Sequence, residues 1–255
     1  MTRVKICGLR NPRDALAARD AGADLLGVIF AKSPRRASLA QARAIRAAIG
    51  PRIELFRADP AHFDNAVDEL GRPLLVGVFA GQPADEIVRI AAEADLDLIQ
   101  LSGGEHPELI ARLTRPVIRV HHVGAETNAD TLLARIAQRP PSVAALDTQS
   151  KRGGGSGRTF DWAIAAAIAR IRPIMLSGGL TPDNVAAAID RVHPWAVDVA
   201  SGVERRSEKD GRLRPGVKSP DLVRAFIQNV RDADETDLDP LELDPLGLDP
   251  LGDEL

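Results

Sequence analysis

Two side chains able to exchange protons close short apolar runs at widely separated places in the chain. Cys7 ends the run VKIC, and Asp147 follows the run VAAL. Alternate residues of an extended chain share one face, so Lys5 and Cys7 lie on the same face of the first run. A thiolate can remove a proton, and a carboxyl group kept neutral by apolar neighbours can supply one. Taken alone, the two residues are also compatible with an inert buried cysteine and a turn aspartate.

Three glycine-rich turns follow apolar runs in the second half of the chain. They are the segment 153–157, then Ser177-Gly178-Gly179, and then Ala200-Ser201-Gly202. Glycine turns expose backbone N–H groups, and with the N-terminus of a following helix they can hold a phosphate. The alternative is that these glycines only permit tight turns. The recurrence of such turns predicts a phosphate site that contains Gly155, Gly178, Gly179, Ser201 and Gly202.

Three further polar residues are candidates for holding a substrate. Arg35 and its neighbour Arg36, in the segment KSPRR, can capture a carboxylate with paired hydrogen bonds, although a solvated basic loop has the same composition. Gln100 and Asp198 lie inside apolar runs, where an unpaired polar group is costly. We therefore expect both to point into a site or to pair there.

Metal binding is not expected. Cys7 is the single cysteine, which excludes a disulfide within the chain, and no cysteine or histidine cluster has zinc-ligand spacing. The adjacent residues His121 and His122 point in opposite directions on an extended chain, so both cannot readily serve one site. We assign them no role beyond a place at the rim of the fold.

Eight short apolar runs alternate with helix-like segments, a pattern typical of βα units around a parallel sheet. The runs span residues 4–6, 25–30, 74–79, 98–101, 117–120, 143–146, 174–176 and 197–199. Eight units in about 230 residues predict an α/β fold with a single (β/α)8 TIM barrel over residues 1–231, and an open doubly wound sheet is the alternative. Barrel active sites lie at the carboxyl ends of the strands, where Cys7, Asp147 and the glycine turns fall.

Two segments do not follow this alternation. Residues 51–73 make the second helix-to-strand connection longer than usual and are interpreted as an insertion, in which AHFDNAVDEL can form an amphipathic helix. Residues 232–255 form an acidic tail in which the sequence LDPL occurs three times. Proline at that period forbids a continuous helix, so we expect the tail to be disordered, with a partner-binding motif as the alternative.

The charge of the chain is small but unevenly divided. Of 36 acidic residues ten lie in 232–255, so residues 1–231, with all 33 basic residues, carry a net charge of +7. A mildly basic body suits an anionic small molecule, while 3% aromatic residues and no tyrosine argue against nucleic-acid binding. The sequence has neither the roughly 18 apolar residues of a membrane helix nor a secretory signal, so we expect a cytoplasmic protein without membrane contact.

In the order and spacing of its motifs the chain resembles the phosphoribosylanthranilate isomerases of tryptophan biosynthesis. The segments that carry the resemblance are VKICGL, GADLLGVIFAKSPR, VGVFAGQ, DLIQL, LDTQSKRGGGSGRTFDW, LSGGLTPDNV and VDVASGVE. The match runs from Val4 to about Val230 and is interrupted by the insertion. One departure is Ser102, which stands where the family pattern QLHG has a histidine.

The resemblance implies an Amadori rearrangement of N-(5-phosphoribosyl)anthranilate to 1-(2-carboxyphenylamino)-1-deoxyribulose 5-phosphate, with no metal or cofactor. It implies Cys7 as the general base, Asp147 as the general acid, and Arg35 rather than Arg36 at the anthranilate carboxylate. It also implies that the glycine turns bind the phosphate of this small-molecule substrate. Lys5 is a candidate for lowering the pKa of Cys7. We expect a monomer or a homodimer.

Two other functions are compatible with a barrel that binds a phosphorylated sugar. The nearest is the analogous sugar-phosphate isomerase of histidine biosynthesis, whose acid and base resemble two aspartates, and Cys7 argues against it. The other is a barrel that binds a phosphoribosyl ligand without catalysis, in which Cys7 and Asp147 would be dispensable.

Overall fold

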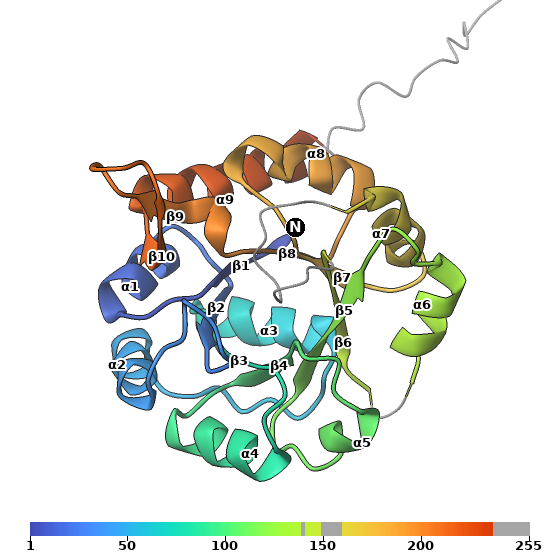
Figure 1. Cartoon of the computed structure of the whole chain (residues 1–255), viewed down its shortest axis with the longest axis horizontal. Helices are drawn as coiled ribbons and strands as arrows, with labels where there is room; N and C mark the ends of the chain where they lie inside the picture. Colours follow the sequence, from blue (N-terminus) through green and yellow to red (C-terminus); the bar gives the residue numbers. More distant parts are fainter. Residues whose placement is uncertain (139–140, 149–159, 237–255) are drawn as a thin grey trace, which may run out of the picture.

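The strands of this chain close into a parallel barrel. The structure, a computed structural model, describes residues 1–138, 141–148 and 160–236. Eight strands pair in parallel in the order of the sequence, and β8 pairs with β1 to complete the ring (Figure 1). They are β1 (Arg3–Cys7), β2 (Leu25–Ile29), β3 (Leu74–Phe79), β4 (Leu98–Leu101), β5 (Val117–Val123), β6 (Val143–Thr148), β7 (Ile174–Leu176) and β8 (Ala196–Val199). All eight predicted strands are confirmed, and the open sheet is excluded.

A helix follows each barrel strand, as predicted. These helices are α1 (Pro12–Asp20), α2 (Leu39–Ile49), α4 (Ala84–Glu93), α5 (Pro107–Ile110), α6 (Ala129–Ile136), α7 (Trp162–Ala169), α8 (Pro182–Val192) and α9 (Pro220–Thr236). Proline at the first helical position loses no needed hydrogen bond, and at α1 the side chain of Asn11 accepts from the backbone N–H of Asp14. Among the described residues, no helix is long and apolar enough to cross a membrane.

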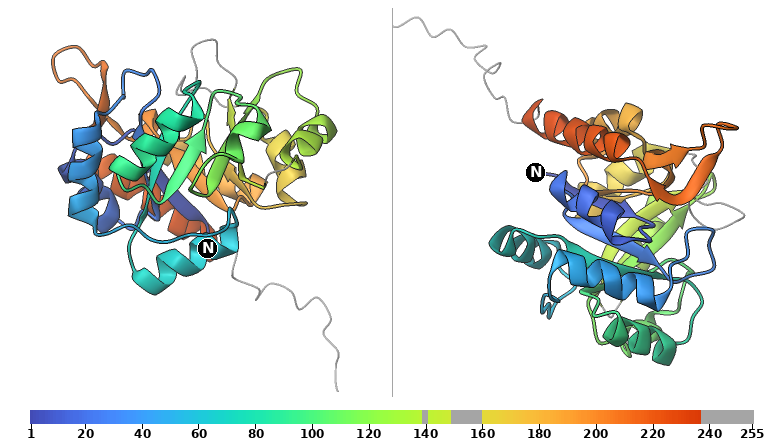
Figure 2. Two further views of the ribbon diagram at one scale, coloured as in Figure 1. Left: turned by 90° about the horizontal axis from the view of Figure 1, so that it is seen from below. Right: turned by 90° about the vertical axis from the view of Figure 1, so that its left-hand side faces the viewer.

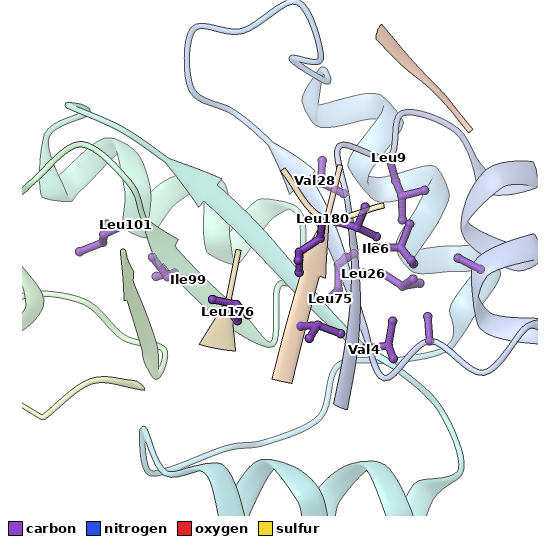
Figure 3. Close-up of a cluster of buried hydrophobic side chains, with 14 of the residues drawn as sticks. Val4, Ile6, Leu9, Leu26, Val28, Leu75, Ile99, Leu101, Leu176 and Leu180 are labelled. Atoms are coloured by element: carbon purple, nitrogen blue, oxygen red, sulfur yellow. The ribbon is translucent and has the colours of Figure 1, made fainter. Parts of the chain in front are cut away.

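Two apolar layers hold the barrel together, because each strand is buried on both faces. The outer layer lies between strands and helices and includes Val4, Ile6 and Leu26, which Figure 3 shows together. The inner layer fills the barrel with alternate residues of the same strands, among them Leu25 and Ala145. Residues of β1 that alternate with Val4 and Ile6 therefore point into the barrel, as the side chains of Lys5 and Cys7 were expected to do.

The insertion forms a cover over the amino-terminal end of the barrel. It contains α3 (Pro60–Leu70), which confirms the predicted amphipathic helix, and Figure 2 shows α3 at the end of the barrel where the chain begins. Phe63 and Val67 of α3 belong to the same apolar cluster as the inner layer. The guanidinium of Arg3 bonds the carboxylates of Asp64 at 2.8 Å and Asp68 at 2.7 Å. The insertion thus lies at the opposite end from the strand termini that carry the candidate site.

A two-stranded hairpin after β8 was not predicted. Its strands β9 (Glu204–Arg206) and β10 (Leu213–Lys218) pair antiparallel and follow a short 3₁₀ helix, η1 (Ser201–Val203). In Figure 2 the hairpin and the loop after β2 project from the end of the barrel opposite α3. The hairpin therefore adds a wall to the mouth of the barrel.

The expected start of the tail at residue 232 is wrong, because α9 continues to Thr236. Acidic residues are unfavourable at the C-terminus of a helix, where the helix dipole is negative. Here the backbone N–H and the hydroxyl of Thr2 each donate to the carboxylate of Asp234 at 2.7 Å, which offsets that penalty. The predicted disorder of the LDPL repeats concerns residues 237–255, which lie outside the described part of the chain.

Candidate active site

The inner layer ends in a ring of chemically active side chains at the mouth of the barrel. Leu98, Val120, Ala145 and Ala196 belong to the inner apolar cluster, and the next residue on the same face of each strand lies nearer the mouth. These mouth residues include Cys7 of β1, Gln100 of β4, His122 of β5, Asp147 of β6 and Asp198 of β8. The fold therefore brings together four of the predicted site residues, and His122 joins them.

Cys7 lies at the end of β1 with only 5% of its surface exposed. Gly27 of β2 is its partner in register, and a Cβ atom at Gly27 would lie 2.7 Å from the Cys7 Sγ. Glycine at this position is thus required to leave room for the thiol. The pKa of Cys7 is raised, because burial disfavours the thiolate more than the nearby Lys5 ammonium favours it.

Lys5 and Asp198 form a buried ion pair beside the thiol. The Lys5 Nζ donates to the Asp198 Oδ1 at 2.9 Å, and the lysine side chain has no exposed surface. Burial alone would lower the pKa of Lys5, but the Asp198 carboxylate and the Cys7 sulfur together raise it above its ordinary value. Lys5 therefore remains an ammonium, and its charge favours the thiolate as expected from the sequence.

Asp147 is the second titratable group of the mouth. Burial raises its pKa to about 6, with a contribution from Asp198, although the neighbouring His122 and the backbone N–H of Thr148 oppose the shift. That N–H donates to the Asp147 Oδ1 at 2.8 Å. Gly178 has a φ of +93°, and a Cβ atom on this residue would collide with the side chains of Thr148 and Asp147. A carboxyl group with this pKa can act as a general acid near neutral pH.

Arg35 reaches the mouth from the loop after β2, but it is not a free cation. Its Nε and Nη2 donate to the two oxygens of Glu204 at 2.7 and 2.9 Å, and both side chains are buried. The backbone N–H of Gly216 donates to the same carboxylate at 2.7 Å. Burial would raise the pKa of Glu204, but these donors and Lys218 lower it below its ordinary value.

Lys218 completes the ionic cluster between the hairpin and the barrel. Its Nζ donates to the carbonyl oxygen of Ala200 at 2.7 Å and lies 3.6 Å from Glu204. Burial lowers the pKa of Lys218, although the charge of Glu204 opposes the shift. The cluster fixes the short chain segment that contains Ser201 and Gly202.

The glycine turns lie at the carboxyl ends of β7 and β8, as predicted. Gly178 and Gly179 have φ values of +93° and +69°, a conformation that disfavours other residues. Gly202 lies in η1, where a Cβ would collide with the carbonyl oxygen of Leu180. Ser201 begins η1. Gly155 lies outside the described residues.

Gln100 and the histidine pair separate into different surroundings. Gln100 is buried, and its Nε2 donates to the Ser102 hydroxyl at 3.3 Å. His122 faces the mouth, where its Nε2 lies 2.9 Å from the carbonyl oxygen of Ser102. His121 alternates with His122 and lies on the helix side of β5, where burial and Arg119 lower its pKa to about 4. No cluster of metal-ligating side chains occurs among the described residues.

Four residues of the site had no predicted role: Gly27, His122, Glu204 and Lys218. Gly27 lies inside an apolar run whose register with Cys7 is known only once the strands pair. Glu204 and Lys218 meet Arg35 only in the folded chain. The available signals were the motifs VDVASGVE, which ends on Glu204, and GADLLGVIFAKSPR, which contains Gly27.

A closed barrel with a thiol and a neutralisable carboxyl group at its mouth defines an acid/base enzyme of the (β/α)8 class. The family model described as N-(5'phosphoribosyl)anthranilate (PRA) isomerase matches residues 57–229. A relative named N-(5'-phosphoribosyl)anthranilate isomerase, from Dehalococcoides mccartyi, is 39% identical over 240 residues, which cover 92% of this chain and 98% of the relative. The chain belongs to the N-(5'-phosphoribosyl)anthranilate isomerase family of tryptophan biosynthesis.

Solved structures of this family have the same fold. Phosphoribosyl anthranilate isomerase from Thermotoga maritima is 35% identical, with a TM-score of 0.74, and the match covers 91% of this chain and all of that one. A second structure contains reduced 1-(o-carboxyphenylamino)-1-deoxyribulose 5-phosphate; it is 33% identical, with a TM-score of 0.69, and the match covers 91% of this chain and 100% of that chain. A third, 32% identical, with a TM-score of 0.71 and the same coverage, is of monomers generated from the dimeric Thermotoga maritima enzyme.

Proposed function

We propose that Cys7 and Asp147 are the base and the acid with which this chain isomerises N-(5'-phosphoribosyl)anthranilate. Asp147 donates its proton to the furanose ring oxygen, the bond from that oxygen to C1 breaks, and the anthranilate nitrogen forms a Schiff base with C1. The Cys7 thiolate then removes the proton from C2, and the electron pair of that C–H bond neutralises the Schiff base as an enaminol. Tautomerisation of the enaminol gives the 1-deoxyribulose product.

The single observation that carries this assignment is the buried ammonium of Lys5, which lies on the same inward face of β1 as Cys7 and is held by Asp198 at 2.9 Å. A thiolate in a buried site needs a compensating positive charge, and Lys5 supplies it. On the other side of the mouth, the pKa of about 6 for Asp147 leaves part of the carboxyl population protonated near neutral pH. The two groups thus have opposite roles because their surroundings differ.

Substrate binding is assigned to the remaining mouth residues. Glu204 occupies the Nε and Nη2 of Arg35, and the Nη1 is left to meet the anthranilate carboxylate. The phosphate would be held by backbone N–H groups of the turns that contain Gly178, Gly179, Ser201, Gly202 and Gly155. Gln100 and Asp198 line the mouth between these ends. No metal or cofactor enters the proposed steps, so treatment with a chelator should leave turnover unchanged.

The test compares Cys7→Ala and Asp147→Asn with the unchanged chain. Each should lower kcat by a factor of about 10² to 10⁴ or more, because each removes one proton-transfer group. Both variants should still bind the reduced product within a few-fold of the parent affinity. The control Asp20→Asn changes an exposed carboxylate that pairs only with Arg19 among the described residues, and it should leave kcat unchanged. Near-parent turnover in either site variant would refute the role given to that residue.

Assembly and location are further expectations. We propose a monomer or a homodimer, and light scattering during size-exclusion chromatography measures which of the two forms in solution. The cytoplasmic location expected from the sequence stays a prediction, which a fluorescent fusion expressed in the native cell would test.

A further inference from the structure

Two unpartnered polar atoms lie buried in the wall of the mouth. In the described part of the chain, five residues have a buried side-chain nitrogen or oxygen without a hydrogen-bond partner: Arg10, Arg46, Gln100, His122 and Trp162. Gln100 and His122 belong to the neighbouring strands β4 and β5, and both side chains face the mouth. A buried polar atom without a protein partner is rare, and in an active site a ligand can supply the partner.

The tautomer of a neutral His122 ring follows from its one hydrogen bond. Its Nε2 lies 2.9 Å from the Ser102 carbonyl oxygen, and a carbonyl oxygen can only accept a hydrogen bond. Nε2 therefore carries hydrogen. When the ring is neutral, Nδ1 has a free lone pair and accepts a hydrogen bond, and the described residues provide no donor for it.

Ser102 fixes both side chains in place. Its hydroxyl accepts from the Gln100 Nε2 at 3.3 Å, while its carbonyl oxygen holds His122 from the next strand. Ser102 occupies the position at which the family pattern has a histidine. In this chain an imidazole reaches the same residue from β5 instead.

The position of His122 relative to the acid is set by strand register. His122 of β5 and Asp147 of β6 are paired residues of adjacent parallel strands, so their side chains point the same way. A group bound at Nδ1 therefore lies next to the carboxyl that we assign as the acid. Of the parts of the substrate, the phosphate and the anthranilate carboxylate are anions that accept hydrogen bonds. The donors are the pentose hydroxyl groups and the anthranilate N–H, and the ortho-carboxylate of the substrate itself can accept from that N–H.

We propose that His122 binds the substrate directly and that its Nδ1, together with the Gln100 amide, forms a site for the pentose hydroxyl groups beside Asp147. This inference rests on the proposed function, which supplies the pentose. Ligand binding gives the two buried atoms the partners they lack in the free protein. Removing one such buried hydrogen bond should weaken pentose binding by about tenfold to a hundredfold.

The experiment uses two variants that divide the functions of the imidazole ring. In His122→Asn the side-chain oxygen can take the place of Nδ1 but cannot reach Ser102. In His122→Gln the amide can reach the Ser102 carbonyl but has no polar atom at the Nδ1 position. Calorimetry measures the affinity of each for reduced 1-(o-carboxyphenylamino)-1-deoxyribulose 5-phosphate and for an analogue that lacks the C3 hydroxyl.

The proposal predicts that His122→Gln loses at least tenfold in affinity for the hydroxylated ligand, whereas His122→Asn stays within about threefold. His122→Gln should also discriminate less than the parent between the two ligands. The reverse order, or equal affinities in all three proteins, would overturn the proposal, since His122 would then serve only to hold Ser102. Because binding of the reduced product requires no turnover, the result is separate from the fate of Cys7 and Asp147 as catalytic residues.

A second variant covers the case in which a His122 change prevents folding. Gln100→Leu replaces the amide, including its unpartnered oxygen, by an apolar group of similar size. It should leave the free protein as stable as the parent or more stable while weakening the hydroxylated ligand at least tenfold. Loss of stability without loss of affinity would contradict the proposed hydroxyl site.

Discussion

Arg35 and Glu204 are joined by two parallel hydrogen bonds of 2.7 and 2.9 Å that connect the loop after β2 to the first strand of the hairpin. The two residues are 169 positions apart in the chain. These two bonds hold the Nε and Nη2 edge of the guanidinium and thereby fix the direction in which Nη1 points. Gly8 lies under the arginine, where a Cβ would be 3.0 Å from the Arg35 Cδ. The hairpin is therefore a support for the arginine that we assign to the anthranilate carboxylate.

Glu204→Gln should weaken substrate binding more than it slows chemistry. The change leaves Arg35 and Lys218 buried without their carboxylate, so the guanidinium loses its fixed orientation. We expect KM to rise by about tenfold or more with a smaller change in kcat, and stability to fall by about 3–5 kcal/mol. Steady-state kinetics and urea unfolding measure both effects. A fall in kcat at constant KM would contradict this role for the hairpin.

The pH profile of kcat/KM should rise through about pH 6, stay level, and fall only above the ordinary pKa of a thiol. The active form has Asp147 protonated and Cys7 ionised, although the pKa of Asp147 is about 6 and that of Cys7 is raised. Below pH 6 the thiolate fraction grows with pH, and between the two pKa values the gain of thiolate offsets the loss of the acid. A descending limb near pH 7 would contradict the raised pKa of the thiol.

Lys5→Met should move the descending limb to higher pH and lower the plateau. The Lys5 ammonium lowers the pKa of Cys7, so its removal raises that pKa and reduces the thiolate fraction at every pH on the plateau. We expect kcat/KM on the plateau to fall by about tenfold or more. Lys5→Met leaves the Asp198 carboxylate without its partner, and the double variant Lys5→Met/Asp198→Asn removes that carboxylate as well. If the descending limb of the pH profile then returns to its position in the parent, the shift was caused by Asp198 and not by the loss of the ammonium.

The sequence was sufficient for the barrel because its strands are buried on both faces. Runs such as LLVGVF at 74–79 are apolar throughout and cannot lie at a surface, so their number and order define the fold. The place of Cys7 and Asp147 followed from alternation within such runs. The helix α3 was predictable for a similar reason, since its apolar residues recur at helical spacing.

The hairpin and the end of α9 were not predictable by the same reasoning. The hairpin strands ERR and LRPGVK are mostly polar and include Pro215 and Gly216, which disfavour a strand. They are held by Glu204 and Lys218, whose partners come from distant parts of the chain. The last turn of α9 likewise depends on Thr2, more than 200 residues away. Local sequence carries no record of such contacts.

Phe63→Ala should destabilise the barrel without affecting catalysis. Phe63 is 1% exposed and packs at 6.1 Å, centroid to centroid, against Trp195 at the end of the barrel opposite the mouth. We expect a loss of about 3–5 kcal/mol in the free energy of unfolding and a kcat/KM within about twofold of the parent. Phe56→Ala is the matched control, because Phe56 is 80% exposed and its loss should change stability by less than about 0.5 kcal/mol. Equal stability of the two variants would show that α3 does not support the barrel.

Asp147→Asn should lower kcat and yet stabilise the folded protein at neutral pH. Burial raises the pKa of this carboxyl group from 3.8 to about 6, so ionisation is harder in the folded chain than in the unfolded one. Below pH 3.8 the group is neutral in both states and has no effect on stability. As the pH rises from 3.8 to about 6 the unfolded chain ionises first, stability is lost, and above about pH 6 the full penalty of about 1–3 kcal/mol remains.

The neutral amide removes that penalty, so urea unfolding should find the variant more stable than the parent at pH 7.5 and equal to it at pH 3.5. A variant less stable than the parent at pH 7.5 would mean that the carboxylate is held by favourable contacts, and the raised pKa on which its role as an acid depends would be wrong.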